Sequence, residues 1–338
     1  MPNANDMNLE ERLESLAKRG GDAEHLYHKY NDVKGYLKAD YYPWVQANCP
    51  YFTDHGERHI QSVIETASQL VVDQKSKSQF LAPMPIFLLL SGIIWHDVGM
   101  VLTRSGHAEE SAKIAEEVRR LAFPDLMTQS IVSSIVRAHS KAGLNAADQR
   151  QDLTLKIGQK SITVFPRALA AIMRFADEVS ETCNRISPDL IKKVPTKSQI
   201  YWQYANCIVA SKPEPSRERV VVTMRLDIAN AINEYSCEDY PPLEKLALIT
   251  YIVRRLEKMN NERAYCGREF GPYATRIREI EVRLSIFNGV NRVVDYDEAP
   301  IILGEGGIHS AGLPDIPILD ELIKKFPNLE PSKLKGLI

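Results

Sequence analysis

The first half of the chain carries apolar residues at the spacing of an α-helix. Residues 55–75 show this most clearly, because apolar side chains recur three and four residues apart and form one face. That face consists of Ile60, Val63, Ile64, Ala67, Leu70 and Val71. Similar patterns predict helices at residues 8–19, 22–48, 84–96, 107–121, 125–139 and 165–185. Residues 140–162 are polar, and we expect a loop or lid there.

The pattern changes after about residue 190. Residues 201–211 and 217–227 are rich in aromatic or β-branched residues, and residues 278–287 alternate between apolar and polar positions. Each of these segments predicts a strand. Residues 241–262 predict one long helix between the second and third strands. We therefore expect a β-β-α-β unit, with an antiparallel sheet crossed by a helix, and then an irregular tail with a short helix near residues 317–326.

Together these patterns predict a mostly α fold, in which a helical bundle precedes a small α+β (β-β-α-β) unit. The chain has 338 residues, which is enough for one large domain or two smaller ones. The expected division is an N-terminal helical extension, a helical domain with the candidate chemistry, an α+β subdomain and a tail. These parts correspond to residues 1–50, 51–190, 191–290 and 291–338.

Charge, cysteine content and hydrophobicity restrict the possible functions and cellular locations of the chain, and they say little about its fold. The formal net charge is −2, so no overall positive charge favours nucleic acid as a partner. Five scattered cysteines form no CxxC pair and indicate free thiols in a reducing, cytoplasmic location. The N-terminal residues lack the apolar core of a signal peptide. The most apolar segment, residues 80–95, is shorter than the roughly 18–20 residues that span a bilayer, so we expect a buried helix.

Candidate chemistry concentrates in the helical half, where five of the eight histidines lie between residues 55 and 139. His96 and Asp97 directly follow an apolar helix, and a carboxylate is costly to bury there unless a cation compensates it. Imidazole nitrogen with carboxylate oxygen suits Mn, Fe, Zn or Ni, and carboxylate with water suits Mg. The dipeptide alone leaves open a second interpretation, in which Asp97 caps a helix.

Two further segments supply groups of the same kind. His55 and His59 are four residues apart and therefore share one helix face. Both can bind one metal, one can bind metal while the other acts on substrate, or the two can be a surface pair. Asp177 lies within an apolar helical run, and its cationic partner is either a metal or Arg174, three residues earlier.

The order of these groups resembles the HD superfamily of metal-dependent phosphohydrolases. A histidine, a His-Asp pair and an aspartate follow one another on separate apolar helices, and the similarity covers about residues 40–190. It is closest at HxxxV (59–63), WHDVGM (95–100) and FADE (175–178). The chain is similar to the HD-CE branch in particular through YFTDHGERHI, IFLLLSGIIWHDVGM, HAEES and the C-terminal β-β-α-β unit.

The resemblance implies a set of metal ligands for one or two divalent ions, with Mn, Fe, Mg, Ni and Zn as the candidate metals. The ligands that it implies for the first ion are His59, His96, Asp97 and Asp177. By the same resemblance, His107 and His139 bind a second metal or the substrate phosphate, with Asp97 bridging. A helix-cap role is the alternative for each of these two histidines.

The resemblance also implies catalytic roles. In related cyclic-nucleotide phosphodiesterases, a His-x-x-x-His motif supplies one proton-donating histidine and one metal ligand. By that similarity His55 protonates the leaving oxygen, and Asp97 orients the attacking water. Gly56 stands where those enzymes have asparagine, so the match is partial. The candidate phosphate-binding cations, each of which can equally be a solvated surface charge, are Arg58, Arg104, Arg137 and Lys141.

The implied activity is hydrolysis of a phosphoester or phosphoanhydride of a nucleotide by a water that the metal activates. The enzyme would be a nucleotide phosphatase, a triphosphohydrolase or a phosphodiesterase, and nothing in the sequence indicates which base it recognises. One alternative is a nucleotide-binding sensor or partner-interaction module with little turnover. A metal-dependent nuclease is another, disfavoured by the near-neutral charge. We expect a nucleotide or other phosphorylated small molecule as partner, no membrane, and self-association or protein binding through residues 8–19 or the C-terminal unit.

Overall fold

The computed structural model describes residues 7–71, 82–118, 122–140, 143–146, 153–157, 160–238, 245–304 and 318–338. The fold is mostly α with a smaller α+β part, as the sequence predicts. The chain divides into two compact units, which we call the helical unit and the sheet unit. The helical unit comprises Met1–Pro50, His55–Ser180 and Cys266–Arg276, and the sheet unit comprises Tyr51–Asp54, Glu181–Tyr265 and Ile277–Ile338. The four-part division expected from the sequence stays a prediction.

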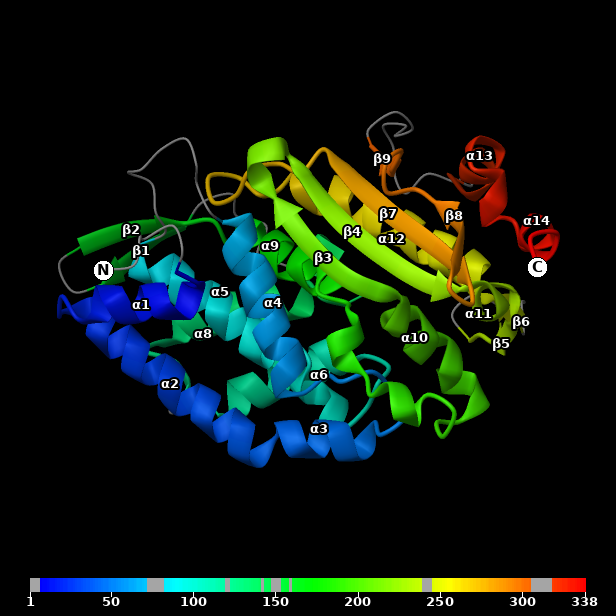
Figure 1. The fold of residues 1–338 in the computed structure, drawn as a ribbon. Helices are drawn as coiled ribbons and strands as arrows, with labels where there is room; N and C mark the ends of the chain where they lie inside the picture. The colour runs from blue at the N-terminus through cyan, green and yellow to red at the C-terminus, as the bar shows by residue number, and fades with distance from the viewer. Residues whose placement is uncertain are drawn as a thin grey trace. The chain divides into compact units, whose positions relative to one another are not determined.

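The helical unit contains every helix predicted for the first half of the chain (Figure 1). Residues 22–48 form two helices rather than one, because Pro43 opens a new helix instead of continuing the old one. The helices are α1 (Leu9–Ala17), α2 (Asp22–Asp40), α3 (Tyr42–Asn48), α4 (Glu57–Leu70), α5 (Pro83–Trp95), α6 (His107–Glu117), α8 (Leu126–Arg137) and α9 (Pro166–Val179).

Helix α5 is the centre of this unit. All its residues from Met84 to Trp95 are buried, and it contacts α1, α2, α4, α8 and α9. A helix that is apolar all round belongs in a core or a membrane. Within the described residues, Pro83–Val101 is the one segment long and apolar enough to cross a membrane, and 94% of its apolar window is buried inside the protein. The prediction of a buried core helix is therefore confirmed.

The loop or lid predicted for residues 140–162 is wrong in part. Its described residues include a short 3-10 helix, η2 (Gly143–Ala146), and strand β1 (Leu153–Ile157), which pairs with β2 (Lys160–Val164) in an antiparallel hairpin. Leu155 and Val164 are buried. The hairpin rests on these few apolar contacts, which the many polar residues of the segment conceal in the sequence.

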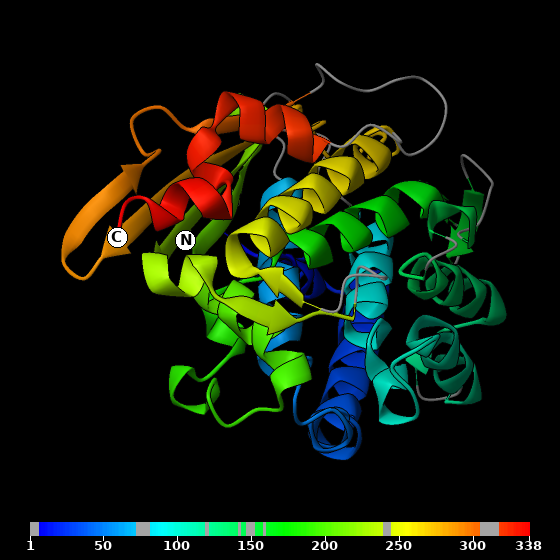
Figure 2. The ribbon, with the colours of Figure 1, turned by 90° about the vertical axis from the view of Figure 1, so that its right-hand side faces the viewer.

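The sheet unit is built on a mixed sheet with strand order β3-β4-β7-β8, in which β9 also pairs with β7. The strands are β3 (Ile208–Glu214), β4 (Arg219–Asp227), β7 (Glu279–Asn288), β8 (Asn291–Asp295) and β9 (Ile301–Leu303). The expectation of an antiparallel sheet is wrong for β4 and β7, which are parallel, while the other pairs are antiparallel. The chain returns from β4 to β7 through α12 (Leu248–Gly267), and such a crossover makes two strands parallel. Figures 1 and 2 show α12 over one face of the sheet.

Two other sequence predictions for this unit need correction. The strand predicted at residues 201–211 is helical up to Cys207, where α10 (Thr196–Cys207) ends. Trp202 and Ala205 of α10 join a buried apolar cluster, so packing overrides the strand preference of the aromatic residues. The tail predicted to be irregular contributes β8 and β9 to the sheet. Its predicted short helix is confirmed as α13 (Ile318–Lys325) and is followed by α14 (Pro331–Lys335).

The remaining elements of the sheet unit are short. Helix α11 (Ile228–Ile232) directly follows β4, and strand β5 (Glu234–Ser236) pairs with β6 (Lys245–Ala247). The long helix predicted at residues 241–262 is present as α12 but begins later. Residues 239–244, where that prediction starts, lie outside the described residues.

The close approach of α5 and α8 gives a stability prediction. A Cβ at Gly92 would lie 2.6 Å from Ile135 Cγ2, and Ile135 is fully buried and β-branched, so it has little freedom to move. We expect Gly92→Ala to lower the free energy of unfolding by about 1–3 kcal/mol. Gly35→Ala in α2 is the control, because a Cβ there meets nothing within 4 Å, and it should raise stability by about 0.5–1 kcal/mol. Chemical denaturation measures both, and equal effects would contradict this account of the packing.

Candidate metal centre

Five histidines and two aspartates converge in the helical unit and form what we call the His/Asp cluster. They come from α4 and the residue pair before it, from the end of α5, from the start of α6, and from the ends of α8 and α9. The cluster consists of His55, His59, His96, Asp97, His107, His139 and Asp177. The structure therefore brings together every residue that the sequence singled out as a metal ligand, together with His55.

Two imidazole nitrogens lie at distances from each other and from two carboxylate oxygens that suit a single cation. His59 Nε2 lies 3.3 Å from His96 Nε2, 3.5 Å from Asp97 Oδ2 and 3.1 Å from Asp177 Oδ1. His96 Nε2 lies 3.2 Å from the same Asp97 oxygen and 3.7 Å from the same Asp177 oxygen. Atoms that each sit about 2.1 Å from one divalent ion are about 3.0–3.4 Å apart in octahedral or tetrahedral geometry. His59, His96 and Asp177 can therefore hold one ion, and Asp97 Oδ2 lies close enough to both imidazoles to serve as a further ligand.

The carboxylate of Asp97 presents its two oxygens to two different groups of histidines. Oδ2 faces His59 and His96, and it lies 2.9 Å from His55 Nδ1. Oδ1 lies 3.2 Å from His107 Nε2 and 3.6 Å from His139 Nε2. A carboxylate placed in this way can bridge two cations, with His107 and His139 as ligands on the second side.

The ring nitrogens of two histidines show that the cluster is arranged for a cation. His96 Nδ1 donates a hydrogen bond to the carbonyl of Ile93 at 2.7 Å, and His107 Nδ1 donates to the carbonyl of Arg104 at 2.7 Å. In the neutral tautomer each ring therefore turns a lone pair on Nε2 toward Asp97. His107 Nε2 is buried and makes no hydrogen bond, although Asp97 Oδ1 is close. Two facing acceptors need either a proton or a metal ion between them, and the nitrogen and oxygen donors present fit a metal ion.

Electrostatics in the cluster favour ionised carboxylates. Burial alone would raise the pKa of Asp97, but the surrounding histidines, above all His96, hold it well below its usual range. The pKa of Asp177 is also well below its usual range, because His139 and His59 outweigh burial. Burial alone would lower the pKa of His96, but Asp97 and Asp177 raise it to about 9. Burial lowers the pKa of His139 to about 3. Without a metal the cluster thus holds a proton on His96, where a metal ligand needs a lone pair.

The structure also settles the interpretation in which Asp97 caps a helix. Asp97 is the N-cap residue of the 3-10 helix η1 (Val98–Val101), but its side chain makes no capping hydrogen bond, so the prediction of a cap is wrong.

The guanidinium of Arg174, the alternative partner for Asp177, donates to the carbonyls of Ala138 and Ser140 at 2.8 and 2.9 Å. Arg174 therefore fixes the end of α8, where His139 lies, and histidines line the carboxylate of Asp177.

A contact between Gly99 and Ser111, which no pattern in the sequence indicated, positions His107 at the start of α6. The Gly99 N–H donates to Ser111 Oγ at 2.7 Å, and this hydroxyl donates to the carbonyl of His96 at 2.9 Å. A Cβ at Gly99 would lie 2.1 Å from the His107 carbonyl oxygen. Both residues occur in the motifs WHDVGM and HAEES, but only the fold shows that they pack the start of α6 against η1.

The candidate phosphate-binding cations lie in different settings. Arg137 pairs with Glu109 and Glu116 at 3.0 and 2.9 Å, so two carboxylates already compensate its charge. Arg58 and Arg104 are exposed. Lys141 lies outside the described residues. Phosphate binding by these side chains stays a prediction.

Comparison with known protein families matches residues 49–257 to HD-CE, and this range contains every member of the His/Asp cluster. The chain belongs to the HD-CE family. The family and the cluster together indicate an HD-type metal-dependent hydrolase. No curated protein and no solved structure gives a significant match to the chain.

The close approach at Gly99 predicts that a side chain at this position lowers the amount of metal that the protein retains. Gly99→Ala must push η1 and α6 apart and displace His107, whereas His59 and Asp177 lie on other helices. After loading with manganese, we expect both Gly99→Ala and His107→Ala to retain fewer ions per chain than the wild type. Elemental analysis after dialysis measures this, with Gly35→Ala as the control. Wild-type metal content in Gly99→Ala would contradict the positioning role.

The protonation of His96 predicts that metal binding depends on pH. A ligand histidine must lose its proton, and the pKa of His96 is raised to about 9 in the metal-free protein. Metal binding at pH 7 should therefore release protons, and the apparent affinity should rise as the pH rises toward 9. Asp97 and Asp177 are already ionised at pH 7 and contribute no such release. Calorimetry in two buffers with different ionisation enthalpies measures the protons released, and identical heats in both would contradict the prediction.

Proposed function

We propose that this HD-CE protein is a phosphohydrolase that acts on a nucleotide and hydrolyses a phosphoester or phosphoanhydride bond. The observation that carries the proposal is the two-sided carboxylate of Asp97, with histidines on each oxygen. When bound there, divalent cations lower the pKa of a water and polarise the phosphoryl oxygens. A pair of cations suits phosphoryl chemistry, since attacking and leaving oxygens both develop negative charge.

The side chains of the cluster would hold the ions, exclude water and donate a proton. His59 and His96 are completely buried and can only hold the ion and exclude water from its inner side. His55 is 21% exposed, so a substrate can reach its ring. Asp97 accepts a 2.9 Å hydrogen bond from His55 Nδ1 and fixes the orientation of the ring. An imidazole held in this way is suited to protonate the leaving oxygen.

The test separates substrates from products by chromatography for a panel of nucleoside mono-, tri- and cyclic phosphates with Mn, Mg, Fe, Ni or Zn, so that phosphate, pyrophosphate, triphosphate, nucleoside and nucleoside monophosphate are all detected. We expect turnover of at least one nucleotide, and Asp97→Asn should lower kcat/KM by about 1,000-fold or more, since it removes the bridging charge. The control is His28→Gln, which changes an exposed histidine of α2. If the metal-loaded protein binds a nucleotide and releases no product, the sensor alternative replaces the proposal.

A second arm of this experiment separates the two possible roles of His55. Its Nδ1 is close enough to Asp97 and His59 for His55 to be a metal ligand as well as a proton donor. For a proton donor, His55→Gln keeps the metal content and lowers kcat, most strongly for substrates with poor leaving groups. Loss of metal in this variant would instead make His55 a ligand.

A further inference from the structure

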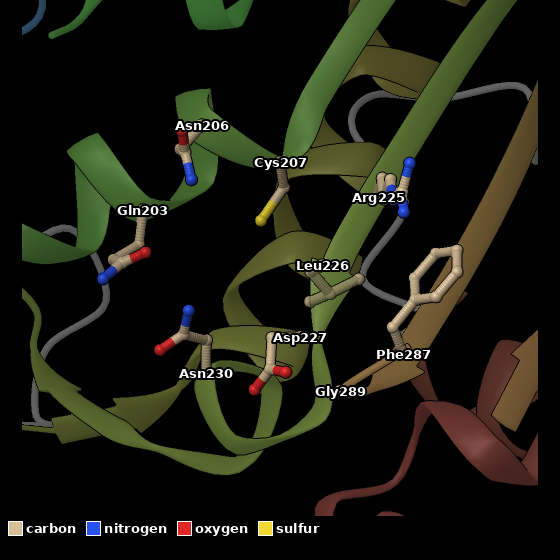
Figure 3. Close-up of a pocket in the computed structure, with 9 residues that line it drawn as sticks. All are labelled: Gln203, Asn206, Cys207, Arg225, Leu226, Asp227, Asn230, Phe287 and Gly289. Carbon is tan, nitrogen blue, oxygen red and sulfur yellow. The ribbon is translucent and has the colours of Figure 1, made fainter. Parts of the chain in front are cut away.

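The sheet unit contains a pocket that none of the residues of the His/Asp cluster lines. Its volume is about 270 Å³. Figure 3 shows three carboxamide side chains on one side of it, and a cation over an aromatic ring on the other. The carboxamides are those of Gln203, Asn206 and Asn230. This lining is polar and holds both signs of charge.

The positions of these side chains follow from the secondary structure. Gln203 and Asn206 are three residues apart on α10, so they lie on the same helix face. Arg225 and Asp227 are two residues apart on β4, so they lie on the same sheet face, about 6.8 Å apart along the strand. Asn230 lies on α11, which begins directly after β4. Helix α10, strand β4 and helix α11 therefore supply the polar side chains of the lining.

The two charged side chains are held in place before any ligand binds. The guanidinium of Arg225 lies 4.2 Å from the ring centroid of Phe287, on the neighbouring strand β7. Such stacking fixes the plane of the guanidinium and leaves its N–H donors available. Asp227 is the N-cap of α11, where its Oδ1 accepts a 2.8 Å hydrogen bond from the Ala229 N–H. The pocket thus presents one oriented cation and one oriented anion.

This balance of charge selects the chemical class of the ligand. A phosphate monoester would be attracted by Arg225 but repelled by Asp227, and a simple cation would meet the opposite problem. A zwitterion satisfies both groups at once. The volume is slightly below the roughly 300–1,000 Å³ of sites for drug-sized ligands, so it suits a small metabolite. Each carboxamide both donates and accepts hydrogen bonds, which suits a polar side chain.

We propose that this pocket binds a free polar α-amino acid in its zwitterionic form. Its carboxylate pairs with Arg225, its ammonium group pairs with Asp227, and its side chain faces the three carboxamides. Cys207 forms part of the buried lining, and burial raises the pKa of its thiol to about 12, so no covalent step is involved. The proposal does not depend on the proposed function, because it concerns other residues in the other unit.

The experiment titrates the full chain with the twenty amino acids by calorimetry. EDTA is present so that the amino acids do not bind free metal ions. The best ligand is then compared with its Nα-acetyl derivative, which lacks the ammonium group, and with its α-carboxamide, which lacks the carboxylate. The variants are Asp227→Asn, which keeps the helix cap because asparagine caps as well as aspartate, and Arg225→Gln. Arg217→Gln is the control, an exposed arginine of the same unit that does not line the pocket.

In the wild type each derivative should bind about 10-fold more weakly or worse than the amino acid, as expected for loss of one charged hydrogen bond. Asp227→Asn should weaken the amino acid similarly and leave the affinity for the acetyl derivative unchanged. Arg225→Gln should do the same with the carboxamide derivative, and Arg217→Gln should behave as wild type.

The proposal is overturned if no amino acid binds at millimolar concentration, or if both pocket variants bind it like the wild type. It is also overturned if adenosine monophosphate binds more tightly than every amino acid and loses affinity in Arg225→Gln. That result would make the pocket a nucleotide site.

Discussion

The arrangement of the helical unit depends on a buried carboxylate, Asp97, and a partly buried one, Asp177, that lie among histidines. The Asp97 side chain is only 5% exposed, and an isolated charge at such a position would cost several kcal/mol. Five imidazoles surround it, of which His96 is protonated in the metal-free protein. They come from residues in or next to α4, α5, α6 and α8, while α9 brings Asp177. Each helix must therefore end or begin at the same point in space, which limits how these helices can pack around α5.

The hydrogen bonds that complete the end of α5 also position residues of the His/Asp cluster. The last carbonyls of a helix lack partners within it, and when buried they must find other donors. Here the carbonyl of Ile93 accepts from His96 Nδ1, that of Ile94 accepts from the Tyr42 hydroxyl, and that of His96 accepts from Ser111. The bonds that complete the helix thus also fix the tautomer of a ligand and anchor α6, so the site needs no separate scaffold.

Hydrophobic periodicity and residue chemistry correctly predicted the features that depend on a single segment of the chain. The helices around the cluster, the burial of α5 and the candidate ligands could be read from apolar spacing and from charged groups at the ends of apolar runs. The sequence could not give what depends on two distant segments. The parallel pairing of β4 with β7, the helical state of residues 201–207 and the packing of Gly99 against α6 all arise from tertiary contacts. For the same reason, only the family resemblance implied that the carboxylate of Asp97 bridges two sites. The residues next to Asp97 in the sequence did not indicate it.

The ligands proposed for the His/Asp cluster and for the pocket of the sheet unit require opposite electrostatic environments. The cluster combines two ionised carboxylates with imidazoles that are neutral once they are ligands, so it carries net negative charge and requires cations before an anionic phosphate can approach. In the pocket, Arg225 and Asp227 cancel each other, so a ligand needs no ion to bind there. A nucleotide favours the first environment only after metal has bound, whereas a zwitterion favours the second in any metal state. On the two proposals, charge balance keeps the nucleotide and the zwitterion apart within one chain.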